Sequence, residues 1–399
     1  MSGIFSRLTA DKKIWILYFF AAFACWLLKI MGHNQNNFFI FRASFYHLVN
    51  HLNLYAPYPA EHSDYYYYGP LFPVFFAPFA LPPKAIGLLL WELANAIAYL
   101  IAVNYLPLNI SRKKMLLLFC AIEFANSAFS EQFNPMMVAF IMGAFLLVEK
   151  EKDIWATLLI VAGAMMKLYP IVGLAFFMFS KQKTRFVIST ICWAAVLMVL
   201  PALFCGADFL IDAYHRWLPA VAHKNILNHD LTVRSQDICI MGVVRDFTRN
   251  PNISDLPFYI FGMIVFAVPM LRFSQYNSLQ FRLQVLATLL IMVVIFSSGG
   301  ESPTYILPVT GVFLWLMMKE KPFTTASIIL IVFLLVLTGL GLSDVMPRPI
   351  RHDYIGMYGM KAWPCIVAWL IISWELWFKK FDTETNSKHI NNNDIFVVA

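Results

Sequence analysis

Two carboxylates, Glu61 and Asp64, open the segment of this chain whose residue types best suit acid–base chemistry. Four tyrosines follow Asp64 directly and end at Tyr68, before a Gly-Pro pair. A carboxylate among aromatic rings at a membrane surface is partly desolvated, and this increases its basicity. The segment therefore predicts proton abstraction by Asp64, whereas helix capping or pairing with an arginine is the structural alternative.

Polar residues also gather in two short turns between apolar runs. One turn, "SEQFNP", holds Glu131, Gln132 and Asn134, and the other, "MMKLYP", holds Lys167. Polar groups at membrane depth are costly, so they commonly face a site, although hydrogen bonds that hold helices together are an alternative. The lysine must either extend outward to the membrane surface or meet an anion, which is a lipid phosphate or a carboxylate such as Glu123.

A third group lies in "VRSQDICIMGVVRDF", which contains Arg234, Gln236 and Arg245. Arginine suits bidentate phosphate recognition, whereas a solvated surface charge is the alternative for either one. Further along, Glu301 precedes a Ser-Pro pair, and we expect Ser302 to cap the helix that follows. Such a helix start favours anions, but its structural role alone explains the sequence.

These residues are embedded in a strongly apolar chain. Of the 399 residues, 60% are hydrophobic and 13% charged, and the mean hydropathy is +0.66, a balance foreign to soluble domains. Recurrent apolar runs predict an all-α polytopic membrane protein with about twelve transmembrane helices, in a range of about ten to thirteen. The expected spans are 14–31, 84–106, 114–129, 134–148, 154–168, 169–180, 185–205, 256–271, 281–298, 304–318, 323–343 and 360–378, with a shorter element at 70–82.

The basic residues predict the orientation of the chain. If the spans alternate, the short lysine- and arginine-rich turns fall on one side of the membrane, which identifies that side as cytoplasmic. Both termini then lie inside. The side outside, where we expect any chemistry, receives the segments 32–69, 130–134, 167–170, 206–255, 299–303 and 344–359. The net charge of +7 thus reflects topology, and the dispersed basic residues do not indicate nucleic-acid binding.

Two of the outside segments carry patterns of their own. In the first, Phe38, Phe41 and Phe45 recur at helical spacing opposite polar residues, which predicts an amphipathic helix. This helix either lies in the membrane interface or packs on the bundle, and both are compatible. The segment 206–255 is long for a loop, and its embedded apolar residues argue against disorder.

Other patterns bear on cofactors and domain organisation. The chain has no glycine-rich nucleotide motif, and its six cysteines show no metal-ligand spacing. No carboxylate cluster argues for a metal, so we expect neither a cofactor nor a metal. The predicted organisation is one membrane domain over 1–381 and a cytoplasmic polar tail over 382–399.

The order of these motifs resembles glycosyltransferase family 87, a polytopic group of the GT-C type, over about residues 33–320. In particular, the chain is similar to a bacterial branch with a Glu-His-x-Asp motif in the first loop. It departs from the family where "NQNN" stands in place of an early acidic residue, and where Ser-Glu-Gln replaces an Asn-Gly-Gln turn. The resemblance rests on Asp64-x-x-x-Tyr68-x-Pro70, Gln132-x-Asn134, Lys167-x-x-Pro170, Ser235-Gln236…Gly242…Arg245 and Glu301-Ser302-Pro303-Thr304.

The resemblance implies a GT-C-like glycosyltransferase in a bacterial inner membrane, related to mannosyltransferases that use polyprenyl-phosphate mannose. The donor would be a polyprenyl-phosphate hexose, and the acceptor a glycan or lipid on the extracytoplasmic face. Asp64 would act as the general base, with inversion at the anomeric carbon. Lys167, Arg234 and Arg245 would hold the leaving phosphate, and the other expected substrate contacts are Glu61, Tyr68, Glu131, Gln132, Asn134, Gln236 and Glu301.

Three other functions remain open from the sequence. About twelve spans with broken helices also suit a secondary transporter, although the chain lacks an obvious internal repeat. A lipid-linked polysaccharide polymerase or ligase shares the topology, and a family member without activity could serve in assembly. A site near the outer leaflet would favour the enzyme, whereas a site near the membrane midplane would favour the transporter.

Overall fold

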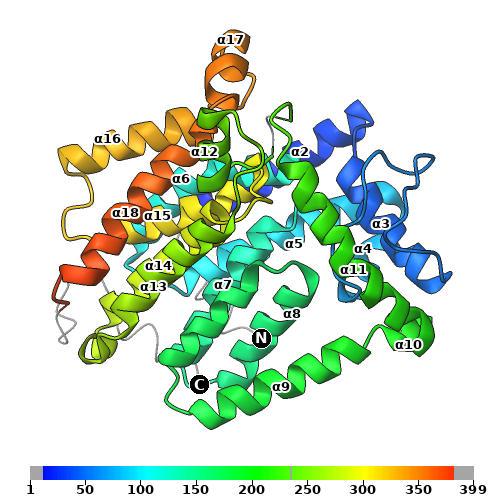
Figure 1. Ribbon diagram of the computed structural model, residues 1–399, viewed down its shortest axis with the longest axis horizontal. Helices are drawn as coiled ribbons and strands as arrows, with labels where there is room; N and C mark the ends of the chain where they lie inside the picture. The colour runs from blue at the N-terminus through cyan, green and yellow to red at the C-terminus, as the bar shows by residue number, and fades with distance from the viewer. Residues whose placement is uncertain (1–11, 234–235, 382–399) are drawn as a thin grey trace. The chain divides into compact units, whose positions relative to one another are not determined.

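The computed structural model describes residues 12–233 and 236–381. Within these residues the regular structure is entirely helical, with seventeen α-helices, α2 to α18, and short 3-10 or π-helical elements between them (Figure 1). The all-α prediction is therefore confirmed for the described part of the chain.

The helices follow the predicted apolar runs closely, because a helix satisfies the backbone hydrogen bonds of such a run internally. The first half contains α2 (Lys12–Gly32), α3 (Asn36–Val49), α4 (Leu71–Ala80), α5 (Lys84–Asn104), α6 (Ile110–Phe129), α7 (Asn134–Glu149), α8 (Asp153–Met166), the 3-10 helix η1 (Tyr169–Met178), α9 (Lys183–Val199) and α10 (Ala202–Cys205). The second half contains α11 (Ala207–Asn228), α12 (Ile240–Thr248), α13 (Leu256–Met270), η2 (Phe273–Asn277), α14 (Leu279–Ile295), η3 (Ser302–Tyr305), α15 (Ile306–Met318), α16 (Thr325–Phe333), the π-helix η4 (Leu334–Gly339), α17 (Arg348–Ile350), η5 (Arg351–Gly356), η6 (Met360–Ala362) and α18 (Trp363–Phe378).

Several helices have the length and composition of membrane spans. Among the described residues, three such helices cover Lys13–Gly32, Lys84–Asn104 and Lys183–Cys205. A fourth span results if Arg348–Gly356 and Met360–Phe378, which are bent by 75°, count as one. Together with many shorter apolar helices, they indicate an integral membrane protein. The count of about twelve crossings and the orientation stay predictions.

The first compact unit comprises residues 15–101 and 127–226. In this unit α3 packs on α4, and α8 packs against both α7 and α9 (Figure 1). Its centre is aromatic, since Phe76 of α4 lies edge-on to Trp91 of α5 at 4.9 Å, and Trp91 stacks on Phe133 at 5.5 Å. Ring pairs of this kind add about 0.5–1.5 kcal/mol each to simple burial, so they hold the short helix α4 firmly.

The second compact unit comprises 102–126 and the described residues from 227 onwards, with the first residues of α2. Its central helix is α15, in which every residue from Ile306 to Met318 is buried. A helix that is apolar on all sides is expected at the centre of a bundle. α14 packs along α15, and α18 packs against both.

The helix predicted in the first loop is present as α3. Phe38, Phe41 and Phe45 are buried, as expected if the apolar stripe packs on the bundle. Ser44 and His47, which the periodicity places on the polar face, are buried as well. Arg42 on the same face is half-buried, so most of the polar face is enclosed and that part of the prediction is wrong.

Two helices, α11 and α12, lie in the segment 206–255, for which the sequence predicts a long loop. The chain leaves α10 at Gly206, whose φ of +71° is a conformation that glycine adopts without strain. α11 then continues for 22 residues. The division into one domain over 1–381 stays a prediction, and the expected tail 382–399 lies outside the described residues.

Candidate functional site

Asp64, the expected general base, lies in the irregular segment between α3 and α4, and its side chain is exposed. Its Oδ1 atom accepts the backbone N–H of Tyr65 at 2.7 Å. The expectation of a partly desolvated carboxylate is wrong, because the neighbouring tyrosine rings pack elsewhere. Tyr66 and Tyr68 both pack on Phe72, with ring centroids 6.2 and 4.6 Å apart.

The residues before Asp64 fasten this segment to α3. Ser63 donates from its backbone N–H and its hydroxyl to Asn36 Oδ1, at 2.8 and 2.9 Å. Glu61 Oε2 lies 3.1 Å from His47 Nε2. Burial lowers the pKa of His47, although the Glu61 carboxylate opposes the shift. A neutral imidazole that donates to Glu61 fits this environment.

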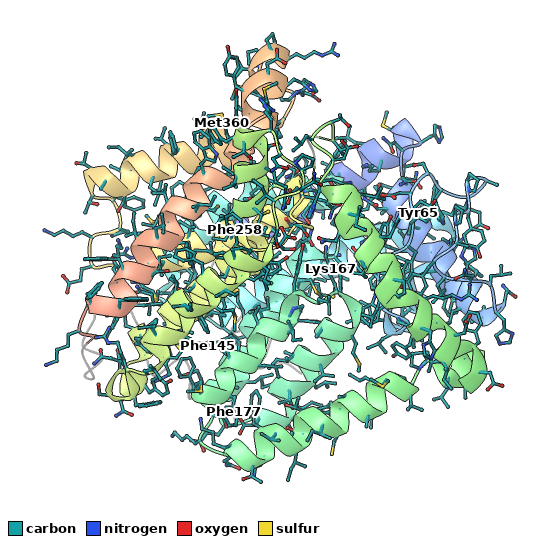
Figure 2. The ribbon with its side chains drawn as sticks, viewed as in Figure 1. Tyr65, Phe145, Lys167, Phe177, Phe258 and Met360 are labelled. Atoms are coloured by element: carbon teal, nitrogen blue, oxygen red, sulfur yellow. The ribbon has the colours of Figure 1, made fainter. Side chains whose placement is uncertain are left out.

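Four of the expected site residues meet in one place. The Tyr68 hydroxyl donates to Gln132 Oε1 at 3.1 Å, and Lys167 Nζ donates to Asn134 Oδ1 at 2.8 Å. The lysine ammonium also lies 5.6 Å from the centre of the Tyr68 ring and 4.9 Å from that of Tyr169. We call Tyr68, Gln132, Asn134 and Lys167 the first-loop cluster; Lys167 is labelled in Figure 2.

Local backbone structure brings the first-loop cluster together. Asn134 is the first residue of α7, and Lys167 is the extended residue that ends α8. Gly69 N–H donates to Met166 O at 3.1 Å, which draws the tyrosine segment onto the end of α8. A Cβ atom at Gly69 would lie 1.9 Å from the Met165 carbonyl oxygen, so only glycine permits this approach.

Glu131, although adjacent to Gln132, points into a different environment. Its Oε2 accepts the N–H of Phe38, in the first turn of α3, at 2.8 Å, and its Oε1 lies 3.2 Å from Lys29 Nζ. Burial raises the pKa of the Glu131 carboxyl, and the Lys29 charge and the Phe38 N–H oppose the shift. Glu131 therefore caps α3 from a distant part of the sequence.

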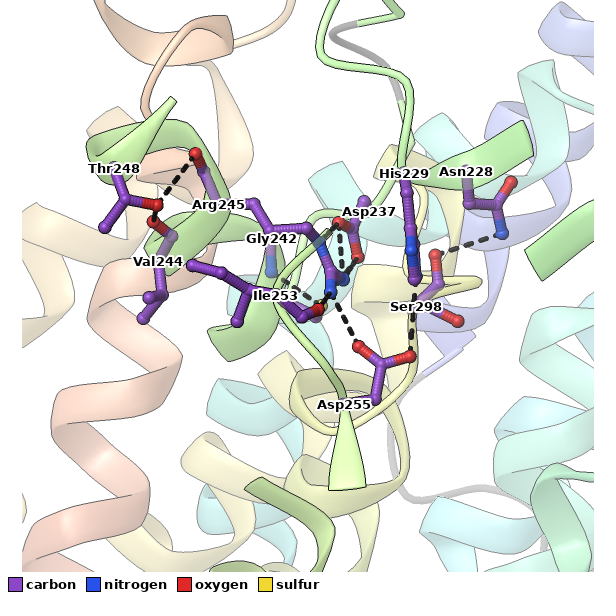
Figure 3. A network of polar contacts seen from close by, with 11 residues as sticks. Asn228, His229, Asp237, Gly242, Val244, Arg245, Thr248, Ile253, Asp255 and Ser298 are labelled. Carbon is purple, nitrogen blue, oxygen red and sulfur yellow. Dashed lines mark hydrogen bonds and ion pairs between the residues drawn. The ribbon is translucent and has the colours of Figure 1, made fainter. Parts of the chain in front are cut away.

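A second polar group, in the other unit, surrounds Arg245, which is 0% exposed (Figure 3). Its Nε and Nη2 donate to the two carboxylate oxygens of Asp237 at 2.7 and 2.9 Å. Its Nη1 donates to Asp255 Oδ1 at 2.7 Å and to the Ile253 carbonyl at 2.9 Å. His229 Nε2 lies 3.4 Å from the other oxygen of Asp255. We call Arg245, Asp237, Asp255 and His229 the arginine cluster.

The arginine cluster is closed around its own charges. Burial raises the pKa of the Asp237 carboxyl, and the hydrogen bond from Cys239 and the Arg245 charge oppose the shift. The guanidinium makes four hydrogen bonds to protein oxygens, which is the pattern of a satisfied buried ion pair. The expectation that Arg245 holds a phosphate is therefore not favoured by its contacts.

The remaining expected residues are dispersed. Gln236 is half-buried beside Asp237, and Arg234 lies outside the described residues. Glu301, not Ser302, occupies the N-cap of η3, where its backbone N–H donates to Thr304 Oγ1 at 3.2 Å. The expectation that Ser302 is the cap is wrong, because the Ser302 hydroxyl accepts from Asn126 at 3.0 Å instead.

One buried ion pair was not predicted as a pair. Lys361 Nζ donates to Glu123 Oε1 at 2.7 Å, and both side chains are about 1–2% exposed. The sequence places Glu123 in an apolar run, which signals a required partner, but it does not indicate a partner 238 residues away. Glu123 therefore links helices of the second unit, as the structural alternative proposed.

A comparison with models of known protein families identifies the family of this chain. The model of glycosyltransferase family 87 matches residues 66–298, which is more than half of the chain. The chain belongs to glycosyltransferase family 87. No curated protein matches it in a similar comparison.

Membership of glycosyltransferase family 87 implies an enzyme with a lipid-linked sugar donor and an acceptor substrate. The matched residues include the whole first-loop cluster and the whole arginine cluster. The match begins two residues after Asp64 and ends before Glu301, so both lie beyond the matched region. The family resemblance inferred from the sequence is confirmed, whereas the roles of individual residues stay predictions.

Proposed function

We propose that this glycosyltransferase moves a hexose from a polyprenyl-phosphate donor to a hydroxyl group of a glycan or lipid acceptor. Mannose is the proposed hexose, by analogy with the mannosyltransferases of the family. The enzyme would work on the extracytoplasmic face of a bacterial inner membrane, with both termini in the cytoplasm. The observation that carries the proposal is the first-loop cluster, which lies within the family match and whose Tyr68 stands four residues after Asp64 in the chain.

In the proposed reaction, the acceptor oxygen attacks the anomeric carbon of the donor. Asp64 takes the proton of the acceptor hydroxyl, and the bond between the anomeric carbon and the phosphate oxygen breaks. The products are a glycoside of inverted configuration and a polyprenyl phosphate, which leaves with the bonding electrons. An exposed carboxylate is accessible to an acceptor hydroxyl, and this supports Asp64 in the role.

The first-loop cluster suits the donor side of this reaction. Negative charge grows on the leaving phosphate, and the ammonium group of Lys167 would stabilise it. The side-chain amides of Gln132 and Asn134 and the hydroxyl of Tyr68 would hydrogen-bond the sugar or phosphate oxygens. For Arg245, its four protein hydrogen bonds favour a supporting role. Arg234, Gln236, Glu61, Glu131 and Glu301 stay as proposed further contacts to substrate.

The test uses purified protein in lipid vesicles with a panel of radiolabelled polyprenyl-phosphate hexoses and a mixed acceptor fraction. Wild type is compared with Asp64→Asn, and with Asp344→Asn as a matched control on an exposed carboxylate. We expect donor consumption by wild type and the control, and a loss of about 100- to 10,000-fold in Asp64→Asn. Full consumption by Asp64→Asn would contradict the base assignment and direct the search to Glu61, Glu131 or Glu301.

A further inference from the structure

The helix α11 carries three distinct faces. Its exposed apolar residues include Ile211, Leu218 and Ile226, which are 57%, 67% and 70% exposed. A second, polar face carries the ion pair between Asp212 and Arg216, at 2.7 Å. The third face turns inward and contacts the tyrosine segment 65–69, which joins Asp64 to α4.

Trp217 and Lys224, two turns apart on α11, both reach Tyr67. The indole Nε1 of Trp217 donates to the Tyr67 carbonyl at 3.1 Å. The Lys224 ammonium lies 5.2 Å from the centre of the Tyr67 ring. The Trp217 ring also lies against Gly69, where an added Cβ would be 3.1 Å from the indole Cη2 atom. α11 therefore holds both the backbone and the side chain of this segment.

The segment 65–69 has no regular secondary structure, and aromatic side chains donate to three of its carbonyls, one of which, that of Gly69, also accepts the N–H of Phe72 at 3.0 Å. The Tyr68 carbonyl accepts from the Tyr55 hydroxyl at 3.1 Å, and the Gly69 carbonyl accepts from the Tyr66 hydroxyl at 2.9 Å. With Trp217 on Tyr67, three consecutive carbonyls are held by three aromatic donors. Burial raises the pKa of Tyr55 and of Tyr66, so both hydroxyls keep their protons as donors.

The three donors differ in where they come from. Tyr55 and Tyr66 belong to the first loop itself, whereas Trp217 comes from a helix about 150 residues later in the chain. Removal of Trp217 thus frees the Tyr67 carbonyl and leaves the hydrogen bonds to the Tyr68 and Gly69 carbonyls intact. A shift of about 1 Å in a group that positions a substrate can cost about 100-fold in rate.

We propose that Trp217, assisted by Lys224, is a positioning residue for glycosyl transfer. It holds the segment 65–69 so that Asp64 on one side and Tyr68 on the other keep the geometry that the reaction requires. The inference rests on the proposed function of this loop, and it assigns a role in the reaction to α11.

The test compares wild type with Trp217→Phe, which keeps an aromatic ring but lacks the N–H donor, and with Lys224→Met. Leu218→Ala is the matched control, since Leu218 is the next residue on α11 but faces outward. Two properties are measured for each: hydrogen–deuterium exchange of the peptide that covers 65–69, without substrate, and kcat and KM for the polyprenyl-phosphate donor in vesicles.

We expect Trp217→Phe to increase exchange in 65–69 and to lower kcat by about 10- to 100-fold, with KM changed less than about threefold. Lys224→Met should act in the same direction and more weakly, and Leu218→Ala should match wild type. Unchanged exchange in both variants would overturn the proposal, and so would increased exchange with unchanged kcat. If Trp217→Phe does not fold, the two measurements on Lys224→Met decide the matter.

The exchange measurement keeps this inference separate from the assignment of Asp64. If Asp64→Asn is fully active while Trp217→Phe shows both expected changes, the base is another group, and the positioning role of Trp217 stands. If Asp64→Asn is inactive while Trp217→Phe behaves as wild type, the base assignment stands and the positioning role fails.

Discussion

The first-loop cluster and the arginine cluster are built from residues of similar polarity, yet they differ in access. Tyr68, Gln132 and Lys167 are half-buried, and the Lys167 ammonium lies against the Tyr68 ring and donates to Asn134, the buried member of the cluster. Arg245 is fully buried and makes four hydrogen bonds to protein oxygens. Three side chains of the first group are partly exposed, whereas the guanidinium of the second has its charge satisfied within the protein.

This difference shows that the presence of a residue in a family motif does not by itself establish that the residue contacts substrate. A buried guanidinium between two carboxylates stabilises a fold only while all three charged groups are present. Loss of one leaves an uncompensated charge in a low-dielectric environment, which is strongly destabilising. Substitution of a half-buried lysine beside an amide costs less stability, and its ammonium group is better placed to bind a ligand. The comparison therefore predicts opposite responses to substitution in the two clusters.

The largest effect is expected for Arg245→Met. It leaves Asp237 and Asp255 buried without their cation, so we expect a loss of about 3–5 kcal/mol in the free energy of unfolding. Thermal unfolding in detergent, followed by intrinsic fluorescence, measures the loss, and Arg249→Met on the exposed side of the same helix end is the control. A variant of normal stability that lacks activity would instead place Arg245 on the substrate.

Lys167→Gln should differ most clearly from Arg245→Met, because it should lower activity and leave stability nearly unchanged. Loss of the ammonium removes a charge-assisted contact to the proposed phosphate, worth about 1.5–3 kcal/mol, so kcat/KM for the donor should fall about 10- to 100-fold. The melting temperature should stay close to that of wild type. Lys181→Gln, at a side chain that is 76% exposed, is the control for charge. A large loss of stability with unchanged kcat/KM would make Lys167 a structural residue.

Glu131→Gln tests whether Glu131 stabilises the start of α3, whereas the adjacent Gln132 belongs to the first-loop cluster. The amide keeps an acceptor for Phe38 N–H but loses the charge that faces Lys29, so we expect a loss of about 1–3 kcal/mol in stability. Exchange should increase most in the first turn of α3. The prediction fails if α3 exchanges as slowly as in wild type and only donor binding weakens.

Tyr68→Phe should have the smallest effect. It removes one neutral hydrogen bond to Gln132 and keeps the ring beside Lys167, so the cost is about 0.5–1.5 kcal/mol. We expect this to appear as a two- to tenfold rise in KM for the donor, whereas Tyr354→Phe at an exposed position should leave KM unchanged. A change in stability without any change in KM would remove Tyr68 from the proposed site.

Much of the helical structure was predictable because long apolar runs report membrane helices directly. The runs at 84–106 and 281–298, for example, appear as α5 and α14 with ends shifted by a few residues. The helix α11 was not predicted, because its apolar residues are divided between an inward and an outward face and are interspersed with charged residues. Its periodicity therefore lacks the single stripe by which an amphipathic helix is identified.

The sequence by itself determined the helical class, the family and the residues of the first-loop cluster, because apolar runs, motif order and costly polar groups are local properties. Only the tertiary structure decided which of the polar groups are already satisfied. Arg245 meets Asp237 and Asp255, Glu131 meets the start of α3, and Trp217 meets Tyr67 through contacts that depend on packing. Burial and hydrogen bonding set the role of a polar side chain, and both depend on neighbours that lie far away in the sequence.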